Sequence, residues 1–257
     1  MGGALIRGMI ASGMTSGDRI MVSSKTPEST AKAASLLGVT GAPSNAQAVR
    51  DASVVFLCVK PAQALEVLRE LAQELNGKLM ISIVAGIRAR ALQTASGEGT
   101  RIIRAMPNTA VRLRKGITAI APDASATPAD LEIARQIFSS VGSAIEVRED
   151  DLDTVTAVSG SGPAFALFML EALAQGGIEG GLDPESAKTF AAGALAAAAA
   201  LVLETGETPL ALRAEITSPA GTTAAGLEVL EESGFPQAVR GAVHAARNRS
   251  IELSGNS

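Results

Sequence analysis

Residues 215–233 carry the sequence EITSPAGTTAAGLEVLEES, in which turn-forming residues and hydroxyls stand directly before a helical pattern. Pro219 and Gly221 interrupt regular structure, and we expect the following helix to begin near Thr222. The first N–H groups of a helix have no partner within the helix, and the helix dipole is positive at that end. The pattern therefore predicts an anion-binding site, although serine and threonine at such positions are also ordinary helix caps.

A second segment, SGSGPAF at 159–165, has the composition of a helix start that other groups approach closely. Gly160 and Gly162 carry no side chain, so the backbone there can come near a neighbour. Pro163 suits the first turn of a helix because its missing N–H is not needed there. We expect a long helix to begin in this segment.

The first half of the chain alternates short apolar strands with helical patterns, which is typical of βαβ units and a parallel sheet. The predicted strands are residues 19–24, 53–59, 78–84, 101–106, 116–121 and 143–147, and the predicted helices are 28–38, 62–75 and 129–141. From Asp151 onward the strand patterns stop and only helical patterns remain. We therefore predict an α/β fold with a Rossmann-like dinucleotide-binding domain at 1–150 and an all-α domain at 151–257.

In an open parallel sheet, ligands bind beyond the carboxyl ends of the strands. The first predicted strand ends in Ser23, Ser24 and Lys25, where an NAD-binding fold usually has an acidic residue. A lysine with two hydroxyls suits the 2′-phosphate of NADP instead, although the tripeptide is also an ordinary polar turn. The residues that follow the later strands include Lys60, Pro61, Ala85, Gly86 and Asn108. At Ala85 and Gly86 the tiny or missing side chain would let a flat ring lie against the backbone.

Composition excludes several classes of partner. The 257 residues carry a net charge of -4 and no run of basic residues, so we expect a small charged metabolite and no nucleic acid. The longest apolar run, 191–203, is too short for a membrane helix, and we expect no membrane segment. Cys58 and His244 are the only residues of their kinds, so we predict no disulfide, no metal site and residence in the cytoplasm.

Five segments, in their order and spacing, resemble the pyrroline-5-carboxylate reductase family of proline biosynthesis: MGGALIRGMIASG, CVKPAQ, IRAMPNTA, TAVSGSGPAFALFMLEAL and EITSPAGTTAAGLEVLEESG. Members of that family have an opening strand and a glycine-rich turn before Met1 and Gly2. We expect either a start assigned at an internal methionine or a truncated chain. Ala110 and Ala220 stand where the family usually has proline and glycine, and we expect Gly221 to keep the second turn open.

The resemblance implies that hydride passes from NADPH, preferred over NADH, to the imine carbon of 1-pyrroline-5-carboxylate, with no metal. It implies that Thr223 is the catalytic residue, with its hydroxyl toward the imine nitrogen, and that the C-terminal helices form a homodimer, with a larger homo-oligomer also open. The substrate-binding residues that it implies are Ser161, Gly162, Ser218, Gly221, Thr222 and Thr223. The cofactor-binding residues that it implies are Gly2, Ser23, Ser24, Lys25, Asn45, Val59, Lys60, Pro61, Ala85, Gly86 and Asn108.

Two other functions compete with this one. A β-hydroxyacid dehydrogenase shares the two-domain plan but depends on a lysine shortly after a glycine-rich helix start, and no lysine lies between Lys115 and Lys188. A non-catalytic remnant would keep the helical domain as an oligomerisation module. The alanine-rich stretch 191–202 fits a tight helix interface, and it also fits high helix propensity alone. Binding of NADPH distinguishes the enzyme from the remnant.

Overall fold

The computed structural model describes residues 1–255, which fold into two compact units. The first unit comprises Met1–Gly160 together with the C-terminal segment that begins at Ala246, and the second comprises Ser161–Ala245. The predicted division into a dinucleotide-binding domain at 1–150 and a helical domain at 151–257 stays a prediction. Residues 256–257, the end of the predicted helical domain, lie outside the described residues.

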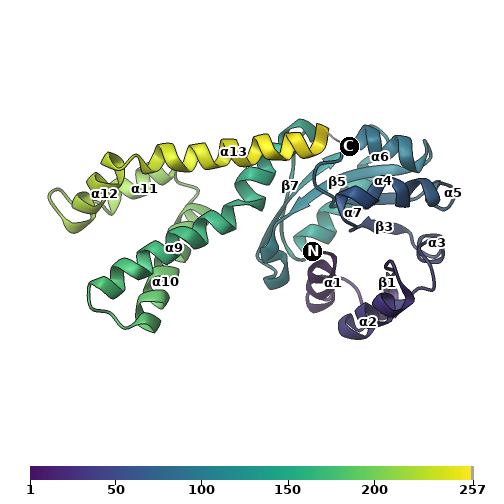
Figure 1. Cartoon of the computed structure of the whole chain (residues 1–257), viewed down its shortest axis with the longest axis horizontal. Helices are drawn as coiled ribbons and strands as arrows, with labels where there is room; N and C mark the ends of the chain where they lie inside the picture. Colours follow the sequence, from purple (N-terminus) through teal and green to yellow (C-terminus); the bar gives the residue numbers. More distant parts are fainter. Residues whose placement is uncertain (256–257) are drawn as a thin grey trace. The chain divides into compact units, whose positions relative to one another are not determined.

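A five-stranded sheet in the order β3-β4-β5-β6-β7 forms the centre of the first unit (Figure 1). Its strands are β3 (Val54–Leu57), β4 (Leu79–Ser82), β5 (Arg101–Pro107), β6 (Gly116–Pro122) and β7 (Gly142–Glu146). β3, β4 and β5 run parallel, so their carboxyl ends lie along one edge of the sheet. The predicted α/β class, with a parallel Rossmann-like sheet and a helical second part, is confirmed.

β6 runs antiparallel to β5, which corrects the expectation of a wholly parallel sheet. Residues 108–115 connect the two strands and contain only the short 3₁₀-helix η2 (Thr109–Leu113). A parallel pair needs a crossover of about a dozen residues or more, so this connection permits only an antiparallel return. β7 then pairs parallel with β6, because helix α7 (Pro128–Ser139) makes the crossover between them.

Successive residues of the central strands enter different apolar cores on the two faces of the sheet. On one face Ile81 belongs to a core with Phe138 of α7, which the apolar side of α1 (Gly2–Ala11) also joins. On the other face Met80 belongs to a core with Leu68. Four helices contribute to the core on that second face: α3 (Asn45–Arg50), α4 (Pro61–Glu70), α5 (Ala72–Leu75) and α6 (Ala89–Ser96). The sheet is therefore the middle layer of three.

β1 (Met21–Val22) and β2 (Thr40–Gly41) form a separate, parallel two-stranded sheet. The strand at 19–24 is therefore shorter than predicted. The sequence pattern does not predict β2, because two residues are too few to show an alternation. Helix α2 (Pro27–Leu37) connects these strands, and its start is fixed by a capping box in which Thr26 accepts the N–H of Ser29.

Short helical segments complete the first unit. They are η1 (Gly17–Arg19), α3 (Asn45–Arg50), η3 (Glu149–Asp151), α8 (Leu152–Val155) and the π-helical turn η4 (Thr156–Gly160). Helices α2, α4 and α7 begin with proline in their first turn, where its missing N–H is not needed. This preference explains why the helix starts near 28, 62 and 129 are predictable from the sequence.

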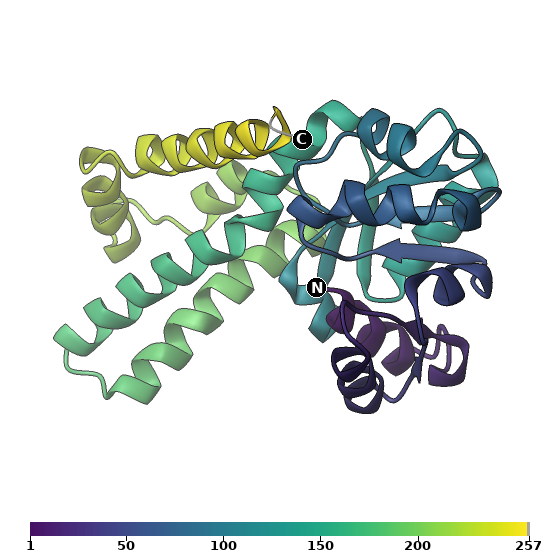
Figure 2. The same cartoon turned by 45° about the vertical axis from the view of Figure 1, so that its right-hand side comes forward.

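The second unit contains only helices. They are α9 (Gly162–Glu179), α10 (Pro184–Thr205), α11 (Pro209–Glu215), α12 (Thr222–Glu232) and the first part of α13 (Phe235–Gly255). α9 and α10 form a hairpin (Figure 2), and Asp183 caps α10 by accepting the N–H of Ser186 over 3.1 Å. A Cβ atom on Gly177 would lie 3.4 Å from that of Ala187, so this glycine lets the two helices pack closely.

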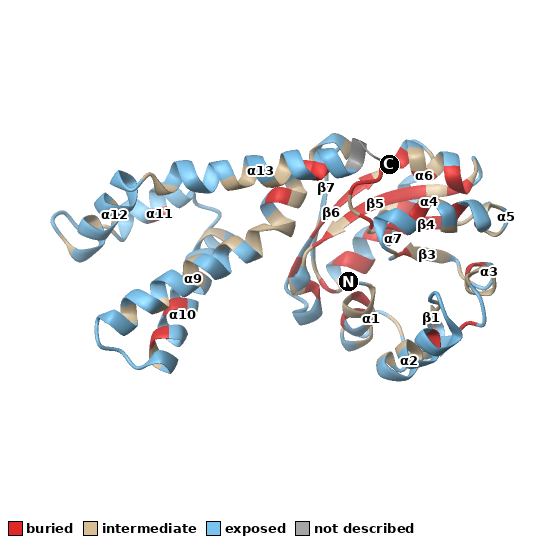
Figure 3. Ribbon diagram, in the orientation of Figure 1, coloured by how far each residue is buried: buried red, intermediate tan, exposed pale blue. Residues whose placement is uncertain are grey.

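Much of the apolar surface of the second unit is exposed (Figure 3), including Phe168, Phe190 and Leu203 at 75%, 67% and 83%. Residues Glu149–Glu179 and Pro184–Thr205 are long and apolar enough to cross a membrane by length and composition, with 6% and 11% of their apolar windows buried. The expectation of no membrane segment rests on residues 191–203 alone, which are too few to span a membrane. The longer helical segments satisfy the criterion of length and hydropathy. Exposed apolar faces of this extent also mark surfaces that another protein chain covers.

Candidate active site

The carboxyl edge of β3, β4 and β5 brings three of the predicted cofactor-binding segments side by side. They are Val59–Pro61 after β3, Ala85–Gly86 after β4 and Asn108 after β5. The parallel register of these strands aligns the three strand ends. Open α/β sheets bind their ligands at this edge, so the fold places these segments where a cofactor would be expected.

Gly86 is restricted to glycine by its backbone and by a close neighbour. Its φ of +77° lies in the left-handed region that residues with a side chain rarely adopt. A Cβ atom there would also lie 3.3 Å from the carbonyl carbon of Leu253, near the end of α13. The loop after β4 therefore passes close to the C-terminal part of α13, and both belong to the first unit.

Gly2, at the start of α1, lies against the end of β3. A Cβ atom on Gly2 would lie 3.2 Å from both Cβ and Sγ of Cys58, so a larger residue would have to displace that side chain. The side chain of Cys58 is exposed. The protein packed beside it nevertheless removes water from the thiol and raises its pKa to about 11. The thiol is therefore protonated near neutral pH, which disfavours a nucleophilic role.

Asn108 already has a structural role on one side of its amide group. Its Oδ1 accepts the N–H groups of Ala110 and Ile117 over 3.2 and 3.3 Å, which caps η2 and holds the start of β6. Its Nδ2 donates no hydrogen bond to residues 1–255. The amide nitrogen is thus the part of this side chain that a cofactor could use.

The predicted phosphate-binding residues Ser23, Ser24 and Lys25 form the loop between β1 and α2. The N–H of Ser24 donates to Oγ1 of Thr30 over 3.0 Å, and the two hydroxyls lie 3.3 Å apart. These contacts fix the loop to α2. Lys25 is exposed and makes no ion pair with residues 1–255, so its ammonium group can receive an anion. Asn45 is the first residue of α3, the helix that follows β2 of the same small sheet.

The glycine-rich segment at 159–165 spans the end of η4 and the start of α9. Single π-helical turns such as η4 are frequent at functional sites. Ser161 occupies the N-cap position of α9 but makes no side-chain cap hydrogen bond. A Cβ atom on Gly162 would meet no other atom within 4 Å. The first turn of α9 therefore leaves space at Gly162, which with Ser161 makes two of the six residues predicted to contact substrate.

The segment at 217–223 forms a tight turn that leads into α12. The N–H of Gly221 donates to the carbonyl of Ser218 over 3.1 Å, and α12 begins at Thr222. Gly221 is the N-cap, and no side chain caps the helix, so the hydroxyls near this end do not perform the capping role that they could have had. Ser218, Thr222 and Thr223 are exposed. The helix end thus retains N–H groups for an anion, as the sequence pattern predicts.

Ala220 has a φ of +57°, and the preceding residue is Pro219. This is the pattern of a type II turn, whose third position favours glycine. Gly221 has an ordinary φ of -83°, so the left-handed position of the turn falls on Ala220. A Cβ atom on Gly221 would collide with Ser218, which agrees with the expectation that this glycine keeps the turn open. The strained position of the turn is Ala220.

A hollow of about 610 Å³ lies along α12, on a side that carries acidic residues. Its lining consists of Thr217, Ala220, Gly221, Ala224, Ala225, Leu227, Glu228, Glu231 and Glu232. Three carboxylates disfavour a negatively charged ligand there. An anion is therefore expected at the exposed first turn of α12 and not inside this hollow.

The two predicted substrate segments lie apart within one chain. α9 begins at one end of the second unit and α12 begins at the other end, in both views (Figures 1 and 2). Both segments are predicted to contact the same substrate. One copy of the chain does not bring them together, so a site that uses both would need a second copy.

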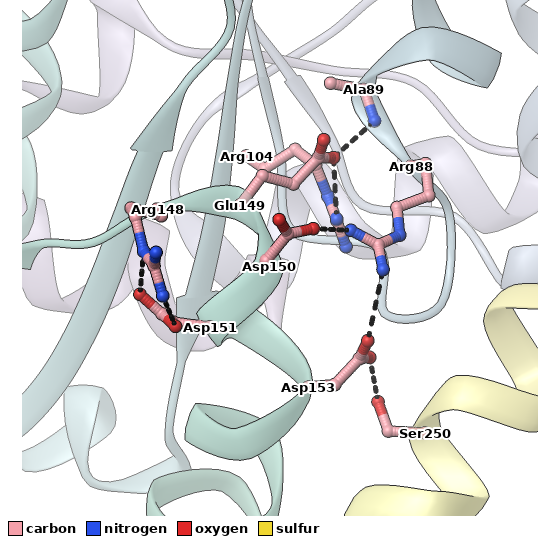
Figure 4. Close-up of polar contacts among 9 residues, drawn as sticks. All are labelled: Arg88, Ala89, Arg104, Arg148, Glu149, Asp150, Asp151, Asp153 and Ser250. Carbon is pink, nitrogen blue, oxygen red and sulfur yellow. Dashed lines mark hydrogen bonds and ion pairs between the residues drawn. The ribbon is translucent and has the colours of Figure 1, made fainter.

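A cluster of charged residues that the sequence patterns miss surrounds the start of α6 (Figure 4). Glu149 accepts the N–H of Ala89 over 2.6 Å and a guanidinium N–H of Arg104 over 2.9 Å. Arg104 is a charged residue within the apolar strand β5, and its side chain is only 8% exposed. An arginine inside such a strand is the signal that could have revealed a buried acidic partner.

Arg88 extends this cluster toward α8. Its guanidinium lies 2.7 Å from Asp150, and this hydrogen bond raises the pKa of Arg88. Arg88 directly precedes α6 and follows the loop that holds Gly86. The cluster therefore fixes the far end of the loop after β4. Among residues 1–255, no group of three or more His, Cys, Asp or Glu side chains could hold a metal ion.

Comparison with known proteins assigns the chain to a family. Residues 149–253 match the family described as pyrroline-5-carboxylate reductase dimerisation, and residues 1–86 match the family described as NADP oxidoreductase, coenzyme F420-dependent. The pyrroline-5-carboxylate reductase of Methanosarcina acetivorans is 42% identical over 254 residues, which cover 98% of this chain and 94% of that protein.

Solved structures agree with this assignment. A pyrroline-5-carboxylate reductase from Coxiella burnetii has 33% identity and a TM-score of 0.90, with coverage of 98% of this chain and 94% of that chain. The pyrroline carboxylate reductase of Plasmodium falciparum, solved with NADP bound, has 28% identity and a TM-score of 0.89, covering 99% of this chain and 94% of that chain. Identity and coverage together show that this chain belongs to the pyrroline-5-carboxylate reductase family.

Proposed function

We propose that this protein reduces 1-pyrroline-5-carboxylate to L-proline with NADPH as the hydride donor, the last step of proline biosynthesis. The observation that carries this proposal is its 42% identity, over nearly its whole length, to a protein of that name. The loops at the carboxyl edge of the sheet and the uncapped start of α12 provide the two kinds of binding site that the reaction requires. Residence in the cytoplasm is part of this proposal.

The reaction converts the C=N bond of the ring into a C–N single bond. The imine carbon receives a hydride, the ring nitrogen ends with a proton, and NADPH leaves as NADP⁺. When bound, the nicotinamide supplies the hydride. The protein must hold the carboxylate, orient the ring against the nicotinamide, place a hydrogen-bonding group at the ring nitrogen and exclude water.

The start of α12 is the proposed carboxylate site. N–H groups of its first turn, with the hydroxyls of Ser218 and Thr222, would donate to the carboxylate. The helix dipole adds about 0.3 to 1 kcal/mol to such an interaction. Gly221 lets the turn close over Ser218 without a side chain in the way. Ser161 and Gly162, at the start of α9, would contact the ring.

Thr223 is the proposed catalytic residue. A threonine hydroxyl is too weak an acid to protonate an imine by itself at neutral pH. We therefore assign it a hydrogen bond to the ring nitrogen, through which it orients an imine that arrives protonated or relays a proton from water. Its exposure at the start of α12 leaves the hydroxyl available for this contact.

The cofactor would lie along the loops of the first unit. Gly2, at the uncapped start of α1, would face the pyrophosphate, and Ser23, Ser24 and Lys25 would receive the 2′-phosphate, which favours NADPH over NADH. The remaining proposed contacts are Asn45, Val59, Lys60, Pro61, Ala85, Gly86 and Asn108. The relative that was solved with NADP bound supports this placement, and so does the restriction of Gly86 to glycine.

A homodimer built from the helical unit is part of the proposal. Residues 149–253 match a dimerisation family, and α9 and α10 expose large apolar side chains that a second copy would cover. The start of α12 lies away from the start of α9 within one chain. A partner's α12 would therefore complete the substrate site.

The test is oxidation of NADPH, followed by the absorbance of the reduced nicotinamide, with 1-pyrroline-5-carboxylate as substrate. We expect turnover with this imine and none with β-hydroxyacids. Thr223→Ala should lower kcat at least tenfold and leave the Kd of NADPH nearly unchanged, because the hydroxyl acts after the cofactor binds. Thr94→Ala, at an exposed position of α6, is the matched control and should change neither value. Turnover of a hydroxyacid without turnover of the imine would refute the assignment.

A further inference from the structure

Ser159 has a buried hydroxyl without a hydrogen-bond partner. It belongs to the π-helical turn η4, and its Oγ is shielded from solvent and makes no hydrogen bond within the described chain. Thr156, in the same turn, donates to the carbonyl of Leu152 over 2.7 Å. Leaving a buried hydroxyl without a hydrogen bond destabilises a protein, so such a group calls for a partner.

The position of η4 indicates where that partner comes from. η4 packs against β5, and a Cβ atom on Gly160 would lie 3.1 Å from Cε of Met106. Met106 is the second-last residue of β5, and Asn108 follows the strand. Gly160, the residue after Ser159, therefore lies against the carboxyl end of β5. The proposed cofactor-binding loops lie along the same edge of the sheet. Ser159 belongs to the first unit, as those loops do.

We propose that the hydroxyl of Ser159 binds the carboxamide of the nicotinamide ring. This inference rests on the proposed function. A serine hydroxyl both donates and accepts, and a primary carboxamide offers both an oxygen acceptor and N–H donors, so either orientation of the amide finds a complementary group. Ser159 is thus a residue that holds the rotation of the ring and thereby determines which face of it meets the substrate.

The cofactor fits this hydroxyl better than the substrate does. The polar groups of the substrate are a carboxylate and a charged imine, which the proposed function pairs with the N–H groups of α12 and with Thr223. The carboxamide is an uncharged polar group at the reacting end of the cofactor, and burying it without a partner would be costly. An uncharged, water-shielded hydroxyl is the complementary partner.

Ser96 provides a matched control. Its hydroxyl is also buried and also makes no hydrogen bond within the described chain. It lies at the end of α6, close in sequence to the start of β5 and thus on the opposite edge of the sheet from the carboxyl ends. Removal of either hydroxyl removes an unsatisfied group, so neither Ser159→Ala nor Ser96→Ala should lower the unfolding temperature of the ligand-free protein.

The experiment measures binding of NADPH by fluorescence titration in the full-length wild type and both variants. Ser159→Ala should raise the Kd of NADPH about fivefold to tenfold, the loss expected for one hydrogen bond to a ligand. Ser96→Ala should leave it unchanged. Adenosine 2′,5′-bisphosphate, which lacks the nicotinamide, should bind wild type and Ser159→Ala equally well.

Three outcomes would overturn the inference. An unchanged Kd of NADPH with a raised KM for the imine would assign Ser159 to the substrate. An equal loss of affinity for the bisphosphate would place its effect at the adenosine end. A lowered unfolding temperature with unchanged NADPH affinity would make it a structural hydrogen-bonding group. Because binding is measured without turnover, a selective loss of NADPH affinity supports the inference even if the proposed substrate is wrong.

Discussion

The hydroxyl of Ser250 donates a hydrogen bond of 2.6 Å to Oδ1 of Asp153, and both residues are buried (Figure 4). Arg88, at the start of α6, lies 3.8 Å from the other carboxylate oxygen of Asp153. Arg247 donates to the hydroxyl of Thr154 over 3.1 Å. The C-terminal part of α13 is thereby held to α8, and α8 is held to the start of α6, beside the loop that contains the proposed cofactor contacts Ala85 and Gly86.

Ser250→Ala should destabilise the protein. The substitution removes a hydrogen bond to a buried carboxylate, for which we expect a loss of about 1.5 to 3 kcal/mol in the free energy of unfolding. Urea denaturation measures this loss. Glu252→Gln, two residues after Ser250 in the same helix, is the control. It weakens the exposed ion pair between Glu252 and Arg249, which contributes about 1 kcal/mol or less to stability. Equal effects of the two variants would show that the contact of Ser250 with Asp153 contributes little.

The contact between Ser250 and Asp153 could not be predicted from the sequence. Asp153 and Ser250 are 97 residues apart in the chain, and neither stands in a periodic pattern. The strands and helices of the first unit are predictable because their signals are local: apolar alternation, proline in first turns and glycine after helix ends. The direction of β6 is also contained in the sequence, since residues 108–115 are too few for a crossover.

The loops of the candidate site could be predicted by position but not by conformation. The strand ends identify Ala85, Gly86 and Asn108, because ligands bind beyond strand ends whatever the detail of the loops. Which residue of a turn takes a left-handed backbone depends on the turn type. This is why Ala220 and not Gly221 is the strained residue, and why Ser159 emerges only from the burial of its hydroxyl.

Ala220→Gly should stabilise the protein. A left-handed backbone costs alanine about 1 to 2 kcal/mol, which glycine avoids, and the greater freedom of glycine in the unfolded chain offsets about 0.4 to 1 kcal/mol of this gain. We expect a net gain of about 0.5 to 1 kcal/mol, seen as a rise of roughly 2 °C in Tm. Ala224→Gly, inside α12, should lower Tm because glycine disfavours a helix interior. A fall of Tm in both variants would contradict the assigned turn.

Lys25→Glu should separate the two cofactors. If the ammonium group receives the 2′-phosphate, a carboxylate in its place repels that phosphate, and the Kd of NADPH should rise at least tenfold. The Kd of NADH should change little, because NADH has a hydroxyl there. Lys32→Glu, an exposed substitution in α2, controls for the change in net charge. Fluorescence titration with both cofactors gives the four values, and an equal loss for NADPH and NADH would remove Lys25 from the phosphate site.

Cys58 should be alkylated slowly near neutral pH. Its pKa is raised to about 11, so the thiolate fraction at pH 8 is on the order of one in a thousand, against roughly a quarter for an unperturbed cysteine. A raised pKa shifts reactivity to higher pH, and the rate should grow about tenfold per pH unit up to the onset of alkaline unfolding. Mass spectrometry after iodoacetamide treatment measures the alkylation rate of Cys58 directly, because Cys58 is the only cysteine in the sequence. A rate that levels off near pH 8.5 would show that the thiol is not desolvated.

Phe190→Glu should turn the proposed dimer into a monomer. Phe190 lies on α10 and is 67% exposed in a single chain, so a glutamate there costs the isolated chain little stability. If a second copy covers this face, the same glutamate is buried without a partner, and a large aromatic contact is lost as well. Light scattering should therefore give twice the chain mass for wild type and the single-chain mass for the variant.

Leu36→Glu, at a side chain of α2 that is 71% exposed in the first unit, should leave the dimer intact. A dimeric Phe190→Glu would place the interface elsewhere, and wild-type protein that enters lipid vesicles would show that these helices serve a membrane. The NADPH assay adds a consequence: since one chain keeps its two substrate segments apart, the monomeric variant should bind NADPH but not reduce the imine.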